Sequence, residues 1–189
     1  TTWTRRNIAG PSHRYGHALS YHAARGVVLA FGGNSGAAFG QTWGLGIPCT
    51  APAISTQPSA QASCHGGSPV FEVGGAGTGP LSYQWLRGEP PEPIEGAIGS
   101  TYTLGSATAM DAGLYRCTIT NACGSVTSTP AMLTVCVGDF NCDGGVDGSD
   151  AEAFFGLWES GDAAADVNSD GGVDGGDVEN FFVEWEAGC

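Results

Sequence analysis

The chain has 189 residues, of which 32 are glycine and only 13% are charged, a composition that suits short strands and turns better than long amphipathic helices. It contains no lysine, and 14 of its 19 acidic residues lie between Asp139 and Glu186, so the net charge of -13 belongs mainly to the last segment. Such a surface repels nucleic acid and anionic lipid, which excludes both as expected partners, and no apolar run approaches the ~20 residues that membrane insertion needs.

The first segment, residues 1–47, contains four short strand-like runs separated by turn residues. The predicted strands are residues 2–5, 17–21, 27–31 and 41–45. A glycine pair, Gly32 and Gly33, ends the third run, and Trp43 lies in the fourth. This pattern resembles a single kelch repeat. The resemblance implies one four-stranded blade of a β-propeller, with Trp3 on its first strand.

A single blade has no neighbouring blades to cover its apolar faces, and a lone repeat is rarely stable. Three arrangements remain open: the chain is a fragment of something longer, the blade packs on the next domain, or another copy completes it. Strand donation from one subunit to the next is a head-to-tail contact, which gives filaments when it does not close. The strand expected to be donated, and so the predicted interface, is Thr2, Trp3, Thr4 and Arg5.

The middle segment, residues 48–135, begins with a short, stiff Pro-containing linker and continues as strand-like runs rich in Ser, Thr and Gly. The predicted strands are residues 70–73, 81–86, 101–104, 114–120 and 125–135. Trp85, together with Tyr115 two residues before Cys117, resembles the immunoglobulin-like family. The resemblance implies a β-sandwich that serves as a spacer or binding module, with Trp85 buried and Tyr115 in a tyrosine corner.

The cysteines of this segment depart from the immunoglobulin pattern. The strand-B cysteine, expected near Val73, is absent, so the usual inter-sheet disulfide is not expected. Pairing among Cys64, Cys117 and Cys123 stays open.

The last segment is an internal repeat: residues 139–161 align without gaps to residues 166–188 and are identical at 15 of 23 positions. Both copies read as 12-residue loops with oxygen-bearing side chains at positions 1, 3, 5, 9 and 12, a turn glycine at position 6 and a glycine carbonyl at position 7. The predicted ligands are Asp139, Asn141, Asp143, Gly145, Asp147 and Asp150 in the first loop, and Asp166, Asn168, Asp170, Gly172, Asp174 and Asp177 in the second. All-oxygen ligation suits Ca²⁺ better than zinc or copper, so we expect two calcium ions.

Each loop is followed by an apolar helix face. Phe154, Phe155 and Trp158 correspond to Phe181, Phe182 and Trp185, and two such faces packed together would form a small core. Residues 136–189 resemble a dockerin module, which implies two loop-plus-helix calcium hands and a protein docking partner. Loop positions 10 and 11 are glycine or serine and no basic residue follows, so a cohesin partner of the usual kind is not expected.

Seven cysteines without a CxxC pair indicate an oxidising compartment, and we expect a secreted protein of the extracellular space or cell surface. The odd count leaves at least one thiol free or shared between chains, and inter-chain linkage is mildly favoured. The chain start has no basic-then-apolar signal, as in a mature, processed protein.

The histidines His13, His17, His22 and His65 come with no recognisable nucleophile and orienting carboxylate, so we expect no enzymatic activity. The predicted fold is mainly β: a kelch-like blade (1–47), an Ig-like sandwich (48–135) and a small α-helical dockerin-like module (136–189). The preferred function is a secreted calcium-binding structural protein whose copies form a homo-polymer, as a fibre or surface layer. The alternative is a fragment of a larger cell-surface adhesin whose dockerin-like module docks onto a protein partner.

Overall fold

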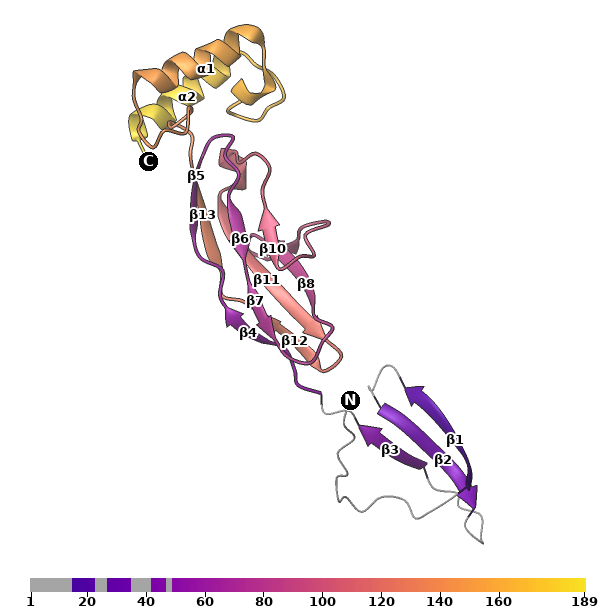
Figure 1. The fold of residues 1–189 in the computed structure, drawn as a ribbon. Coiled ribbons are helices and arrows are strands. Elements are labelled where there is room, and N and C mark those ends of the chain that lie inside the picture. The colour runs from indigo at the N-terminus through magenta and orange to yellow at the C-terminus, as the bar shows by residue number, and fades with distance from the viewer. Residues whose placement is uncertain (1–14, 23–26, 35–41, 47–48) are drawn as a thin grey trace. The chain divides into compact units, whose positions relative to one another are not determined.

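The computed structural model describes residues 15–22, 27–34, 42–46 and 49–189 (Figure 1). The chain forms two compact units, Thr1–Ala51 and Pro52–Cys189, which are described separately below. The prediction of a mainly β chain with an Ig-like sandwich and C-terminal helices is confirmed. Within the described ranges, neither helix has the length and apolar character of a membrane span.

The first unit contains an antiparallel sheet in the order β1-β2-β3. Its strands are β1 (Tyr15–His22), β2 (Val27–Asn34) and β3 (Thr42–Gly46). They correspond to three of the four strands predicted for the blade. The fourth, with the predicted interface residues Thr2, Trp3, Thr4 and Arg5, lies outside the described residues.

One face of this sheet carries exposed aromatic and aliphatic side chains. Tyr15, Leu19 and Tyr21 alternate along β1 and are 67%, 63% and 60% exposed. Their pairing register places Leu19 opposite Ala30 and Tyr21 opposite Val28, so the apolar character continues onto β2. The sheet therefore presents an apolar face that the described part of this unit does not bury.

The second unit begins with a β-sandwich. Its strands are β4 (Ala53–Thr56), β5 (Gln61–Cys64), β6 (Val70–Glu72), β7 (Gly74–Ala76), β8 (Ser82–Arg87), β9 (Glu92–Pro93), β10 (Thr101–Thr103), β11 (Gly113–Asn121), β12 (Gly124–Thr127) and β13 (Ala131–Cys136). One sheet has the order β5-β13-β11-β8-β9, with β12 also paired to β11, and the short pairs β10-β6 and β4-β7 complete the sandwich. A 3₁₀ turn, Ala109–Asp111, precedes β11.

The sandwich core contains the residues that suggested an immunoglobulin fold. Trp85 is fully buried and its indole Nε1 donates to the Gly99 carbonyl at 3.0 Å. The Tyr115 hydroxyl donates to the Asp111 carbonyl at 2.9 Å, as a tyrosine corner requires, and burial raises its pKa to about 12. Both predicted roles are confirmed. Val73 is buried where a disulfide partner of Cys117 would be expected.

The strand boundaries differ from the prediction in one informative place. Residues 125–135 form two strands, β12 and β13, instead of one. Pro130 lies between them and has no N–H for a sheet ladder, while the Ser128 N–H donates to the Cys117 carbonyl. The pairing with β11 is therefore interrupted here: β12 pairs with the second half of β11, and β13 pairs with its start in a register shifted by one residue.

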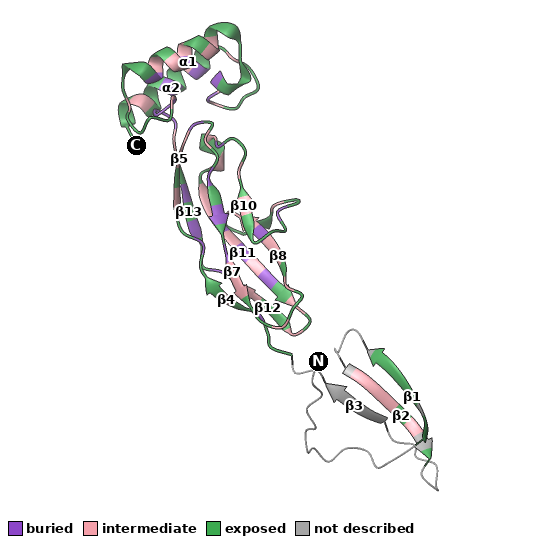
Figure 2. Ribbon diagram, viewed as in Figure 1, coloured by how far each residue is buried: buried purple, intermediate pink, exposed green. Residues whose placement is uncertain are grey.

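The C-terminal part contains two helices, one in each copy of the sequence repeat: α1 (Gly148–Ser160) and α2 (Gly175–Ala187). Phe154 and Phe181 are fully buried and stack with ring centroids 4.4 Å apart, and Phe140 meets both rings edge-on. Figure 2 shows these helices with buried positions on the facing sides and exposed positions outside. The predicted small core between the helices is confirmed.

Candidate metal centre

The first acidic loop, residues 139–150, is held by its own carboxylates. Asp139 accepts the N–H groups of Asp143 and Gly144 at 3.1 and 3.2 Å, and Asp150 accepts those of Asn141 and Asp147 at 3.0 and 2.8 Å. Asp150 is fully buried. The carboxylates at positions 1 and 12 therefore close the loop from both ends.

The second loop, residues 166–177, repeats this network. Asp166 accepts from the N–H groups of Asp170 and Gly171 at 3.1 and 3.0 Å. Asp177, also fully buried, accepts from those of Asn168 and Asp174 at 3.2 and 2.8 Å. Equivalent residues thus make equivalent hydrogen bonds, so the sequence repeat is also a structural repeat.

The backbone conformation of the loops is equally repetitive. Cys142 and Ser169, at position 4, have φ of 63° and 58°, and they are the non-glycine residues with positive φ in the part of the chain that the structure describes. Gly144 and Gly171, at position 6, have φ of 91° and 93°, a conformation that glycine adopts without steric cost. Left-handed residues at both positions curl each loop around its centre.

The side chains are placed in these loops as predicted, but they are not gathered as a coordination group. Within 15–22, 27–34, 42–46 and 49–189, no three His, Cys, Asp or Glu side chains lie close enough together to hold a metal ion. Each 12-residue loop nevertheless carries five oxygen-bearing side chains and one glycine carbonyl at the predicted positions, and an all-oxygen donor set of this kind fits Ca²⁺.

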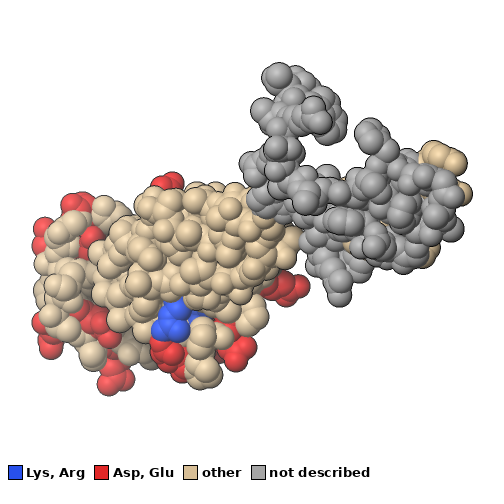
Figure 3. Space-filling model, turned by 90° about the horizontal axis from the view of Figure 1, so that it is seen from below, with Lys and Arg blue, Asp and Glu red and all other residues tan. Residues whose placement is uncertain are grey.

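The loop carboxylates have no cation beside them in the described ranges. The two arginines described there, Arg87 and Arg116, pair with Asp111 and Glu89 in the sandwich. On the face shown in Figure 3, most of the acidic side chains gather at one end, whereas arginine occupies one small area that has further acidic side chains beside it. Mutual repulsion of the loop carboxylates therefore favours binding of a cation.

The loops differ at position 11, which is Ser149 in the first and Gly176 in the second. The Ser149 hydroxyl donates to Asp147 Oδ1 at 2.7 Å and accepts from Asn141 Nδ2 at 2.7 Å. Hydrogen bonds from the Ser149 side chain and backbone lower the pKa of the Asp147 carboxyl. Loop 1 thus has a side-chain link between positions 3 and 9 that glycine cannot supply in loop 2.

Two tryptophans connect the loops in a way that the sequence did not reveal. Trp158 Nε1, on α1, donates to the Asp174 carbonyl of loop 2 at 2.8 Å, and Trp185 Nε1, on α2, donates to the Asp147 carbonyl of loop 1 at 3.1 Å. The sequence pattern predicts both only as core residues. The two tryptophans occupy equivalent positions in the repeat, and this equivalence is the sequence signal that could have suggested equivalent roles. In the structure, the tryptophan of each helix donates to the position 9 carbonyl of the other loop.

Disulfides close the module and join it to the sandwich. Cys136 pairs with Cys189, and Cys64 on β5 pairs with Cys142 in loop 1. Cys49 and Cys123 are also disulfide-bonded. The free thiol is that of Cys117, which is fully buried, so the expectation that the odd cysteine links chains is wrong: this sulfur faces the sandwich core. The disulfides agree with the predicted oxidising, extracellular environment.

His65 lies between the sandwich and the acidic module. Its ring stacks on Phe140 with centroids 5.1 Å apart, and its Nε2 donates to the Ala164 carbonyl at 3.0 Å. Nδ1 is buried without a hydrogen-bond partner, and burial lowers the pKa of His65. These contacts join the sandwich to residues on both sides of the first helix. His13 lies outside the described residues, as do the side chains of His17 and His22.

Acidification is expected to destabilise this junction through His65. The pKa of His65 is lower in the folded protein, so the unfolded chain takes up the proton more readily. The contribution of His65 to stability is therefore present above the ordinary pKa of about 6.5 and is lost as pH falls below that value. Urea unfolding at pH 7.5 and 5.5 measures the loss. His65→Gln keeps an amide donor but does not titrate, and an unchanged pH dependence in this variant would contradict the assignment.

No protein-family model matches this chain. It is 35% identical over 104 residues to the decoration protein of Escherichia phage T5, a match that covers 51% of this chain and 62% of that protein. It is 32% identical over 88 residues to endoglucanase C of Cellulomonas fimi, covering 46% of this chain and 8% of that enzyme. The chain thus spans only part of the length of either relative.

Among solved structures, the I-band fragment of titin matches with a TM-score of 0.41 and 24% identity, covering 45% of this chain and 32% of that one. Extracellular domains of Drosophila OTK match with a TM-score of 0.44 and 20% identity, covering 58% and 38%. These likenesses concern the fold. The Ig-like assignment itself rests on the strand order, the buried Trp85 and the tyrosine corner described above.

Proposed function

We propose that this chain is a secreted, non-enzymatic, calcium-binding structural protein whose copies assemble head to tail into an extracellular fibre or surface layer. The observation that carries the calcium proposal is the repetition of one set of backbone N–H to carboxylate hydrogen bonds and of one backbone conformation in the two acidic loops. In this proposal the module is dockerin-like and each loop holds one Ca²⁺ through its carboxylates, its Asn and the carbonyl of Gly145 or Gly172. The bound ions supply the positive charge that the loops lack.

Calcium is expected to stabilise the module because an ion that binds only the folded loops shifts the unfolding equilibrium. At a free concentration of one hundred times the dissociation constant, each site adds about 2.7 kcal/mol to the free energy of unfolding. Isothermal titration should give two ions per chain, and unfolding midpoints should rise with calcium. Magnesium at equal concentration is the matched control. No binding heat together with an unchanged midpoint would overturn the calcium proposal.

The proposed head-to-tail assembly is supported by the exposed apolar face of the first unit, where Tyr15, Leu19 and Tyr21 lie along β1. A kelch-like blade needs a neighbour on such a face, and a second copy could supply one. We expect negative-stain electron microscopy of the purified chain to show regular filaments in calcium that disperse in chelator. Small dispersed particles in both conditions would overturn self-assembly.

The second candidate is a fragment of a larger surface adhesin whose dockerin-like module docks onto a protein partner. It is favoured by one finding: a stretch similar to part of this chain makes up 8% of a much longer protein, endoglucanase C. This candidate predicts a monomer in calcium that forms a complex only when its partner is added. Sedimentation velocity on the purified chain separates the two proposals.

A further inference from the structure

The sandwich contacts the first acidic loop much more closely than the second. Position 4 of loop 1 is Cys142, which is joined to Cys64 of β5 by a disulfide with a Cα–Cα distance of 5.3 Å. Position 2 is Phe140, whose ring stacks on His65. Two contacts, one of them covalent, therefore fix the start of loop 1 against the sandwich.

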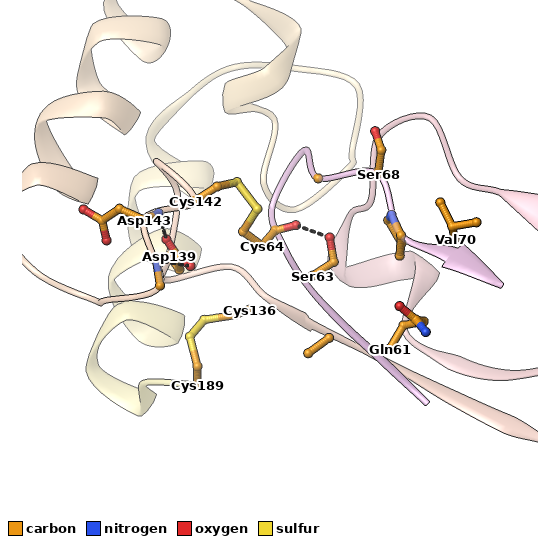
Figure 4. A pocket seen from close by; sticks show the side chains of 14 residues that line it. Gln61, Ser63, Cys64, Ser68, Val70, Cys136, Asp139, Cys142, Asp143 and Cys189 are labelled. Carbon is orange, nitrogen blue, oxygen red and sulfur yellow. Dashed lines mark hydrogen bonds between the residues drawn. A yellow bond between two sulfur atoms is a disulfide. The ribbon is translucent and has the colours of Figure 1, made fainter. Parts of the chain in front are cut away.

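Figure 4 shows this junction. Asp139 and Asp143 lie beside the Cys64–Cys142 disulfide, and the Cys136–Cys189 disulfide is close by. The Asp139 side chain is buried here, at 8% exposure, whereas its equivalent in loop 2, Asp166, is half-buried. The first ligand of loop 1 is thus held in a protein environment to which the sandwich contributes.

Near the start of loop 2 the sandwich makes a hydrogen bond, from His65 Nε2 to the Ala164 carbonyl at 3.0 Å, but among the described residues loop 2 has no disulfide to the sandwich. Its position 4 is Ser169, which is exposed and forms no disulfide, and its position 2 is Val167. Toward the sandwich, Val167 and Asn168 border a cavity of about 160 Å³ that is also lined by Met110. The repeat therefore places one loop in covalent contact with the sandwich and the other across a gap from it.

We infer that the two calcium sites are unequal, and that the Cys64–Cys142 disulfide makes loop 1 the tighter, slower-releasing site. This inference rests on the proposed calcium function. The left-handed conformation at position 4 must be adopted for a loop to surround its ion, and the disulfide restrains it in Cys142 whereas Ser169 has no such restraint. The Ser149 link in loop 1, which Gly176 cannot make, acts in the same direction.

The test uses loop-specific variants of the full chain. Asp170→Ala disables loop 2 and reports on loop 1, while Asp143→Ala, at the same position 5, disables loop 1 and reports on loop 2. We expect calcium to bind the Asp170→Ala protein roughly tenfold more tightly than the Asp143→Ala protein. The reason is that the disulfide already holds part of loop 1 in its binding conformation, so less ordering is needed when the ion binds. Stopped-flow release into a fluorescent chelator should be slower by a similar factor.

The same pair is then measured with Cys64→Ser and Cys142→Ser added, and the difference in affinity should shrink because loop 1 weakens while loop 2 does not. Equal affinities in the disulfide-bonded proteins would overturn the inference, as would a difference that disulfide removal leaves unchanged. If the serine double variant does not fold, Ser149→Gly with the disulfide intact serves instead, and it should weaken loop 1 selectively because the hydrogen bonds of Ser149 lie within that loop. Absence of calcium binding in every protein would refute the proposed function itself, a result distinct from two equal sites.

Discussion

The Cys136→Ser/Cys189→Ser variant is expected to lose about 4 kcal/mol of the free energy of unfolding of the acidic module. The disulfide joins residues 53 positions apart and encloses both loops and both helices. Opening it gives the unfolded segment more conformational freedom, while the folded segment keeps the same contacts. The module is small and strongly acidic, so this loss is a large share of its stability. Chemical denaturation followed by tryptophan fluorescence measures it, since Trp158 and Trp185 lie in the module.

The sandwich provides the internal control for that experiment. Trp85 is buried in its core, away from the Cys136–Cys189 disulfide, and a Trp158→Phe/Trp185→Phe background would leave Trp85 as the reporter within the second unit. The sandwich transition should move much less than that of the module. An equal shift of both transitions would show that the two parts unfold as one cooperative block, and no shift in either would show that the disulfide adds nothing to stability.

The strongest local patterns in the sequence predicted the parts of the fold that depend on short-range chemistry. The duplicated Asp/Asn/Gly spacing predicted two loops of one conformation, and the Phe pairs that follow predicted the helix faces that stack at Phe154 and Phe181. Trp85 and Tyr115 indicated the sandwich through their resemblance to the immunoglobulin-like pattern, in which a buried tryptophan and a tyrosine corner are characteristic. Each of these features depends on a few residues that are close together in the sequence, so it can be predicted without knowing which distant residues they contact.

The features that the sequence did not predict depend on contacts between distant residues. Strand β5 pairs in parallel with β13, and no local signal marks so short an edge strand. Cys64 could not be paired from spacing because its partner, Cys142, lies inside the first acidic loop, residues 139–150. His65 looked like an isolated histidine, yet it stacks on Phe140 across the junction. Such pairings are decided by tertiary packing, which periodicity does not encode.

Replacing Phe181 by alanine should cost about 3–5 kcal/mol, because the side chain is fully buried and its removal leaves a cavity between the helices. The ring stacks on Phe154 at 4.4 Å and meets Phe140 edge-on at 5.9 Å, so the loss includes aromatic contacts as well as buried area. Phe140 belongs to loop 1, while Phe181 follows loop 2. Under the proposed function, the variant should therefore bind calcium more weakly in both loops.

The adjacent residue offers a matched control. Phe182 has the same chemistry on the same helix, but it is 36% exposed and lies outside the buried pair. Phe182→Ala should destabilise the module clearly less than Phe181→Ala and leave calcium affinity nearly unchanged. Thermal unfolding and calcium titration of the two variants side by side make the comparison. Equal losses would mean that the helices are held by their whole aromatic seam, whereas a dominant loss in Phe181→Ala locates the stability of the module in the Phe140, Phe154 and Phe181 cluster that connects its two loops.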